Sequence, residues 1–298
     1  MRMRAKYLPG MWLLLVSCAA QQAPAAAPDA LEIVRRSVSR DNRNWILARN
    51  YVYTQRAERR EVDGRGQVKS TEVKTYEITF LYDEPYRKLI ARDDRPLSAD
   101  EQHKEEAKLE RTMAARKAES PAQRLKRLSK LQQRRERQRT LVRQIPEAYN
   151  LRLAGEERLR GHDCWVIEGT PRPGFHPETP EMRLLSKLRI KLWIEKEGYE
   201  WVRDTADLID NVTYGLLLAR LDKGSHLEFE QTLVNNEVWL PARQFVSYSG
   251  RLGLVIGAGG QQENTYSNYR RFETEAHVMG APQEKSADPP PSKKHEKQ

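Results

Sequence analysis

The chain has 298 residues, of which 32% are charged and 38% hydrophobic, and its mean hydropathy is −0.82. This composition excludes a polytopic membrane protein, because no segment beyond the N-terminus approaches the roughly 20 consecutive apolar residues that a spanning helix needs. It also excludes a wholly disordered chain, because 6 Trp, 12 Tyr and 5 Phe supply enough apolar surface for a core.

The net charge of +10 is concentrated in two segments. Residues 101–145 contain 14 Lys and Arg against 6 Asp and Glu, and residues 1–20 contain 3 basic residues and no acidic one. The rest of the chain is close to neutral, so the basic pI alone does not indicate a nucleic-acid-binding protein. Residues 87–148 also lack the aromatic side chains on which bases stack, and we expect no nucleic-acid partner.

The N-terminus predicts export from the cytoplasm. Three basic residues precede the short apolar run Met11–Val16, as in a secretory signal peptide. Leu15-Val16-Ser17-Cys18 resembles a bacterial lipobox, in which the Cys is diacylated and becomes the mature N-terminus; cleavage after Ala20 is the alternative. We therefore expect a signal peptide over residues 1–20 and a flexible linker over 21–28. Cys164 is then the only Cys left for pairing, so no intramolecular disulfide can form.

The first part of the folded chain predicts a helix followed by strands. Asp29 and Glu32 form a capping box, and Leu31, Val34 and Val38 follow at helical spacing, so a helix is expected to about Asn42. From Trp45 the pattern changes to period two, with turns at residues 63–66 and 83–85. This region predicts an antiparallel meander with one apolar face.

Residues 97–145 predict a basic helical insert. They lack Gly and are rich in strong helix formers, and Ser120-Pro121 ends one helix and caps the next. Leu125, Leu128 and Leu131 form a narrow stripe that we expect to hold the second helix against the sheet or its partner helix. The residues expected to lie partly outward and contact an anionic surface are Arg124, Lys126, Arg127, Arg134 and Arg135.

Strand patterns resume at Tyr149 and continue to Phe272. The clearest is Leu188–Ile194, in which four aliphatic residues alternate with polar or aromatic ones. About ten strands follow one another through tight turns without βαβ alternation, which predicts one strongly curved antiparallel sheet with helices against its concave face. The single domain is expected to span residues 29–272, and residues 273–298 are expected to form a disordered tail.

The chain lacks a recognisable catalytic or metal-binding motif. Val255–Gly260 resembles a dinucleotide-binding loop only superficially, since no helical pattern follows it, and a flexible hairpin loop is expected instead. The six His do not have metal-ligand spacing, and Cys164 is best explained as a small buried hydrophobe. The carboxylates of strand regions, namely Asp204, Asp207, Asp210, Glu228 and Glu230, are expected on solvated faces. We predict no catalysis, no cofactor and no metal.

Two segments resemble the LolA/LolB-like outer-membrane lipoprotein-sorting superfamily. Gly155–Ile167 has the spacing of a family strand pair, and Lys191–Tyr199 is similar to a family strand and turn. The resemblance covers roughly residues 29–95 and 146–272. It implies an unclosed β-barrel around a hydrophobic cavity that shields acyl chains in the periplasm. The basic insert departs from the common pattern, and a lipobox is more typical of the anchored acceptor than of the soluble carrier.

The resulting hypothesis is a monomeric cell-envelope carrier or acceptor that binds acyl chains of lipids or lipoproteins and is anchored to the outer membrane at Cys18. The alternative is an envelope-stress sensor or interaction module that binds lipoproteins and uses its basic hairpin to bind a membrane partner. One apolar face of several strands supplies the candidate cavity residues, namely Tyr76, Ile78, Phe80, Leu188, Ile190, Leu192, Ile194, Leu227, Phe229 and Leu233.

Overall fold

The computed structural model describes residues 28–48, 50–63, 65–82, 84–179, 181–214, 219–252 and 255–271. The expected signal peptide, the linker up to residue 27 and the expected C-terminal tail lie outside these residues. None of the helices within the described ranges is long and apolar enough to cross a membrane.

The sheet is built entirely from antiparallel pairs and stays open. Thirteen strands belong to it, in the order β4-β3-β2-β1-β13-β12-β11-β8-β7-β6-β5, with β9 and β10 attached beside β12. The predicted curved antiparallel sheet is therefore confirmed. The strands are β1 (Tyr51–Val62), β2 (Val68–Leu81), β3 (Glu84–Arg92), β4 (Arg95–Pro96), β5 (Tyr149–Leu159), β6 (His162–Pro171), β7 (Leu188–Glu195), β8 (Trp201–Leu208), β9 (Val212–Tyr214), β10 (Ala219–Leu221), β11 (His226–Val234), β12 (Val238–Leu252) and β13 (Val255–Arg271).

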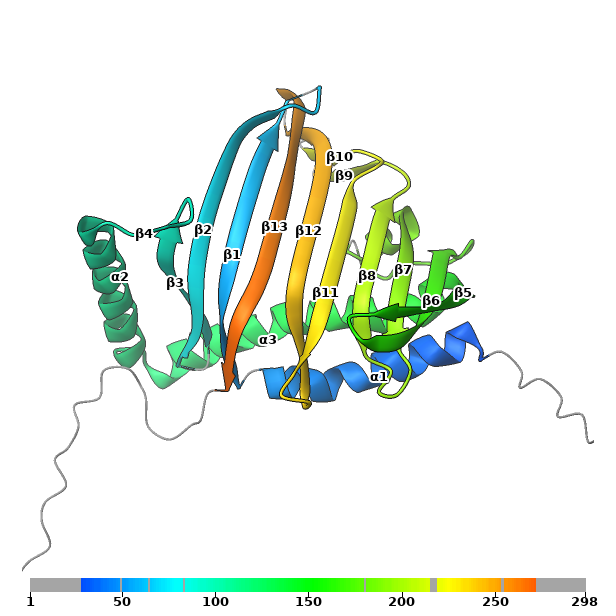
Figure 1. The fold of residues 1–298 in the computed structure, drawn as a ribbon, viewed down its shortest axis with the longest axis horizontal. Helices are drawn as coiled ribbons and strands as arrows, with labels where there is room; N and C mark the ends of the chain where they lie inside the picture. The colour runs from blue at the N-terminus through cyan, green and yellow to red at the C-terminus, as the bar shows by residue number, and fades with distance from the viewer. Residues whose placement is uncertain are drawn as a thin grey trace, which may run out of the picture.

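Helices accompany the sheet on one face and at one end (Figure 1). They are α1 (Ala30–Ala48), α2 (Ala99–Lys117), α3 (Pro121–Arg143), α4 (Ile145–Ala148) and the 3₁₀ helix η1 (Met182–Lys187). In Figure 1, α2 stands beside β3 and β4, while α1 and α3 cross the sheet near one end of its long strands. We call the side that packs on α1 the helix-covered face and the other side the outer face.

The N-terminal helix is longer than the sequence pattern predicts. α1 continues to Ala48, so the predicted start of the first strand at Trp45 is wrong, and β1 begins at Tyr51. Leu47 and Ala48 pack against a buried cluster of Tyr51, Val238 and Leu240. Apolar contacts from strands almost 200 residues away therefore extend the helix beyond its local signal.

The basic insert forms the two predicted helices, each with a complete capping box. Ser98 caps α2 with Glu101, and Ser120 caps α3 with Gln123, with Pro121 in the first turn. Of the predicted leucine stripe, Leu125 is 71% exposed, whereas Leu128 and Leu131 are half-buried, and α3 has no fully buried residue. The insert connects β4 to β5, which form opposite edges of the sheet. It therefore links the first group of strands to the second across the whole width of the sheet.

An ion-pair cluster fixes the hairpin to the sheet. Arg127 contacts Glu119 at 2.9 Å and Glu84 at 3.1 Å, and Arg116 bridges the same two carboxylates at 2.9 and 3.0 Å. The guanidinium of Arg127 holds the pKa of Glu119 below its usual range by hydrogen bonding to it. Glu84 begins β3, so the turn between α2 and α3 is fastened to the β2–β3 end of the sheet.

The outer face carries paired charges where solvated carboxylates were expected. Glu228 is only 7% exposed and contacts Arg203 and, at 3.3 Å, Arg243. Glu230 is bound by Arg160 and lies 3.8 Å from Arg203. The expectation for these two carboxylates is therefore wrong, because the curved sheet gathers arginines from two strands, β8 and β12, and from the turn between β5 and β6 around them.

The glycine-rich segment at residues 255–260 is part of β13 and not a hairpin loop. Gly259 pairs with Val62, and a side-chain carbon at Gly259 would lie 2.7 Å from the Val62 side chain. Glycine is therefore required here by the close approach of two strands, which explains the motif without a nucleotide.

Candidate functional site

Strand pairing determines which side chains share the helix-covered face. Directly paired residues of an antiparallel sheet point to the same side. Leu192 pairs with Asp204, Asp204 with Phe229, Phe229 with Gln244 and Gln244 with Asn264. Because Leu192 belongs to the core beneath α1, this whole row lies on the helix-covered face.

One end of this face is a solid core. Ile190, Leu192 and Ile194 of β7 are buried together with Ile33 and Val34 of α1. Leu188 packs against the edge of the same cluster. These four residues share a face as predicted, but α1 covers them, so none of them lines an open cavity in the described structure.

The remaining residues predicted to line a cavity do not lie together in the structure. Ile78 is buried, whereas Tyr76, Phe80 and Phe229 are half-buried and Leu227 packs at the border of the core. Leu233 lies on the outer face, in the cluster with Trp193 and Trp239. The register of β11 against β12 shifts between Glu230 and Gln231, and such a β-bulge re-aims the side chains beyond it.

A group of half-buried side chains lies on the helix-covered face beyond this core. We call this group the central floor; it consists of Phe229, Val246, Tyr53, Tyr76 and Tyr266. Among the residues that the structure describes, none of the five belongs to a buried core cluster. Tyr53 and Tyr266 contact each other edge to face, with ring centroids 5.9 Å apart. The central floor is thus a partly accessible aromatic surface.

Amide side chains interrupt the central floor, which sequence reasoning missed. The Asn264 amide donates to the Gln244 carbonyl oxygen at 3.2 Å, and the Tyr266 hydroxyl donates to the same oxygen at 3.4 Å. Burial raises the pKa of Tyr266 to about 12, so its hydroxyl stays protonated and able to donate. A ligand on this surface therefore meets hydrogen-bonding groups as well as apolar ones.

Asp204 is the carboxyl group of this row. Burial, and secondly the charge of Glu228, raise the pKa of Asp204 to about 7. Within the part of the chain that the structure describes, no hydrogen bond reaches the carboxyl. The sequence signal was the alternation Asp204, Ala206, Leu208, in which two apolar members predict an inward face for the third. The expectation of a solvated Asp204 is therefore wrong.

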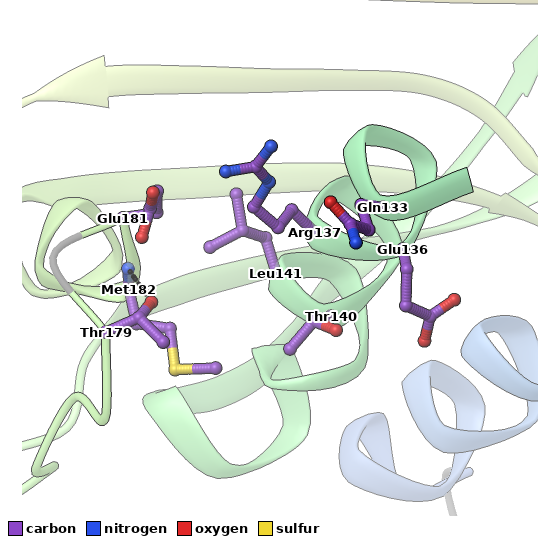
Figure 2. A pocket seen from close by; sticks show the side chains of 8 residues that line it. All are labelled: Gln133, Glu136, Arg137, Thr140, Leu141, Thr179, Glu181 and Met182. Carbon is purple, nitrogen blue, oxygen red and sulfur yellow. Dashed lines mark hydrogen bonds between the residues drawn. The ribbon is translucent and has the colours of Figure 1, made fainter. Parts of the chain in front are cut away.

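Helix α3 crosses this face with a cavity on each flank. Figure 2 shows the first, about 420 Å³, where Leu141 and Thr140 of α3 face Thr179 and Met182 before and within η1. The second, about 440 Å³, separates α3 from α1 and is lined by Val38, Val142 and three arginines. α3 is therefore only partly packed on the body of the protein, although its Leu141 touches the core.

The basic residues of α3 do not all face outward as predicted. Arg127 is only 12% exposed, within the ion-pair cluster, and Arg135 is half-buried. Arg124, Lys126 and Arg134 are exposed. Arg127 therefore holds the α2–α3 turn to the sheet, because that turn brings Glu119 next to it and Glu84 of β3 contacts it as well.

The described residues contain no group of three or more His, Cys, Asp or Glu that could hold a metal ion. Cys164 is free and buried, and burial raises its pKa to about 11, so its thiol is protonated at neutral pH. This arrangement suits packing and not nucleophilic chemistry.

Comparisons with known proteins find similar structures but no similar sequence family. No family model and no curated protein matches the sequence. A DUF1329 family protein from Desulfovibrio piger matches the structure at 14% identity and a TM-score of 0.32, covering 84% of this chain and 95% of that one. A LolA superfamily protein from Nitrosomonas europaea matches at 11% and 0.28, covering 83% and 95%. The MucA/MucB complex of Pseudomonas aeruginosa matches at 11% and 0.22, covering 83% and 100%.

The matches include the LolA superfamily. The sequence motifs resemble the same superfamily, and this chain itself has an open antiparallel sheet with an N-terminal helix. At TM-scores of 0.32 or less the likeness carries no argument about activity, so the function has to be inferred from this chain's own residues.

Proposed function

We propose that this protein binds acyl chains of lipids or lipoproteins non-covalently between α3 and the central floor, as a carrier or acceptor in the periplasm. It acts without catalysis and is anchored to the outer membrane by a lipid on Cys18. The proposal rests mainly on one observation: α3 has no buried residue and has a cavity of about 420 or 440 Å³ on each flank.

The size and lining of these cavities support the proposal. Ligand sites are typically about 300–1,000 Å³ and mostly apolar, with a few polar groups that orient the ligand. Transfer from water is worth about 0.8 kcal/mol for each buried CH₂, so a chain of about 14 carbons gains roughly 11 kcal/mol before losses. The residues that line these two cavities do not include the central floor, so the proposal requires α3 to move outward for one acyl chain to contact both.

Two phenylalanines provide a matched test. Phe229 lies in the central floor, while Phe245 pairs with Glu228 on the outer face and is likewise half-buried. With delipidated protein and a neutral pyrene-labelled diacylglycerol, we expect Phe229→Asn to weaken binding about tenfold and Phe245→Asn to leave it unchanged. Equal affinities for the two variants, each folded by circular dichroism, would contradict the proposed site.

The lipid anchor has its own test. Cys18→Ala should release the protein from membranes or leave the precursor uncleaved, because the thioether-linked lipid can no longer form. Mass spectrometry of the mature N-terminus checks this directly. A mature chain beginning at Gln21 would contradict the anchor and favour plain export.

The exposed basic face of α3 supports contact with an anionic membrane surface. Lys126, Lys130 and Arg134 are exposed and recur every fourth residue, so they share one side of the helix. Basic residues near an anionic bilayer contribute about 1 kcal/mol each. The unlipidated protein should sediment with phosphatidylglycerol vesicles at low salt, less at high salt, and little with phosphatidylcholine. Equal binding to both lipids would contradict an electrostatic role of these basic residues in membrane contact.

The alternative is an envelope-stress sensor or interaction module that uses the same fold to bind lipoproteins and a membrane protein partner. The same exposed face of α3 favours it, since charged helix faces also bind protein partners. Deletion of the insert cannot test this, because the insert joins opposite edges of the sheet. Charge reversal of Lys126, Lys130 and Arg134 can: loss of a co-purifying membrane protein with lipid binding intact would favour the sensor.

A further inference from the structure

A third cavity lies on the outer face, away from the proposed acyl-binding site. It has a volume of about 410 Å³ and lies between β1, β2, β3, the end of β13 and α2. Arg270 pairs with Val52, and Thr79 pairs with Tyr86. Val52 and Thr79 alternate along their strands with Tyr53 and Ile78 of the helix-covered face, so most of the lining lies on the outer face, while Phe80 shares the side of Ile78 at the end of β2.

The walls of this cavity are apolar and its rim is cationic. Leu109 of α2 lines it together with Val52 and Leu81, which supply its apolar surface on the outer face. The polar lining contains three cations, Lys88, Arg270 and Arg271, but a single carboxylate, Glu77. Arg270 donates to that carboxylate at 2.9 Å, and Arg271 lies 3.6 Å from Glu237, so Lys88 is the cation of the described lining that neither carboxylate contacts and that a second anion would meet.

Tyr86 adds an independent observation. Its hydroxyl oxygen is buried at the cavity and has no hydrogen-bond partner within the described residues. Burial raises the pKa of this phenol, so it remains a donor at neutral pH. A buried hydroxyl without a partner is costly, and such groups are rare in folded proteins. An acceptor atom of a bound molecule would satisfy it.

We propose that this cavity binds a single fatty acid, with its chain against Leu109, Val52 and Leu81 and its carboxylate accepting hydrogen bonds from Tyr86 and Lys88. The cavity volume lies within the usual range for ligands of this size. The site is separate from the helix-covered face and does not depend on the function proposed for that face.

Titration calorimetry with dodecanoate and with methyl dodecanoate tests the site on the full-length mature protein. We expect dodecanoate to bind and the ester, which lacks the charge, to bind at least about tenfold more weakly. Tyr86→Phe should weaken dodecanoate binding about tenfold while leaving thermal stability unchanged or higher, because it removes an unsatisfied hydroxyl. Lys88→Gln should reduce the preference for the acid over the ester.

Controls separate this site from the helix-covered face. Phe229→Asn should leave dodecanoate binding unchanged, and Tyr86→Phe should leave diacylglycerol binding unchanged. Loss of dodecanoate binding in Phe229→Asn with none in Tyr86→Phe would overturn the proposal and assign the fatty acid to the central floor. Equal affinity for acid and ester would also overturn it. Loss of diacylglycerol binding alone would leave the outer-face site standing.

Discussion

Replacement of Asp204 by Asn should abolish a pH dependence of stability. The carboxyl lies in β8 between Leu192 and Phe229 on the helix-covered face, and its pKa is raised from 3.8 to about 7. At about 1.4 kcal/mol per pH unit, this difference corresponds to about 4 kcal/mol. Because the side chain is half-buried and water screens part of this effect, the expected change in the free energy of unfolding lies between about 2 and 4 kcal/mol.

The sign follows from which state holds the proton. Below pH of about 4 the carboxyl is neutral in both states, and its full contribution to stability is present. Between about 4 and 7 the folded protein keeps the proton that the unfolded chain has lost, so the free energy of unfolding falls as the pH rises. Above 7 the folded protein carries a poorly solvated charge. Asp204→Asn stays neutral throughout, and it should therefore be more stable than the native protein at pH 8 by about 2–4 kcal/mol.

Urea denaturation of both proteins across this pH range measures the difference. Asp163→Asn is the control, because Asp163 is 63% exposed beside Arg158 and should change the profile little. If Asp204→Asn follows the native pH profile, or is less stable at pH 8, the carboxyl has a partner or full hydration, and its placement on the helix-covered face is wrong.

Three further changes have expected outcomes. Gly250→Ala should lower the free energy of unfolding by about 2 kcal/mol in urea, because the added carbon would lie 2.1 Å from the Arg220 carbonyl oxygen and force β10 from β12; unchanged stability would contradict this close approach. Ser120→Ala should cost α3 about 1 kcal/mol, seen as faster amide exchange in its first turn, whereas Ser129→Ala in mid-helix should not reproduce the effect. Arg127→Gln should speed amide exchange across α2 and α3 about tenfold while the sheet stays protected, and protection lost equally everywhere would mean that the hairpin is not a separate unit.

Local chemistry determined what could be predicted from the sequence. The boundary between α2 and α3 follows from Ser120, Pro121 and Gln123, whose capping contacts involve only neighbouring residues. The aliphatic alternation of Leu188–Ile194 likewise identified a shared face. The same pattern could not identify what covers that face, because α1 reaches it from more than 140 residues away, and a cavity wall and a core wall have the same alternation.

Non-local pairing accounts for the remaining errors. The place of β13 beside β1, and hence the identity of the central floor, depends on contacts that no local pattern encodes. Leu233 moved to the outer face through a bulge with no sequence signature, whereas Asp204 could have been found from the period-two neighbours in its own strand. The sequence located the basic segment correctly, but only the folded α2–α3 turn shows that Arg127 forms an ion pair with Glu119 and is not available to an external partner.

The central position of the last strand has a kinetic consequence. β1 and β13 pair from Tyr51 with Arg271 to Val62 with Gly259, so their contacts join segments roughly 200 residues apart. Such contacts form slowly, because a long loop must close before any pairing is gained. Until β13 arrives, β1 and β12 present two open strand edges in the middle of the future sheet. A chain that is synthesised N-terminus first therefore passes through a state in which the strand edges most prone to wrong pairing are its central ones, and its folding yield should depend on how quickly the C-terminal strand follows.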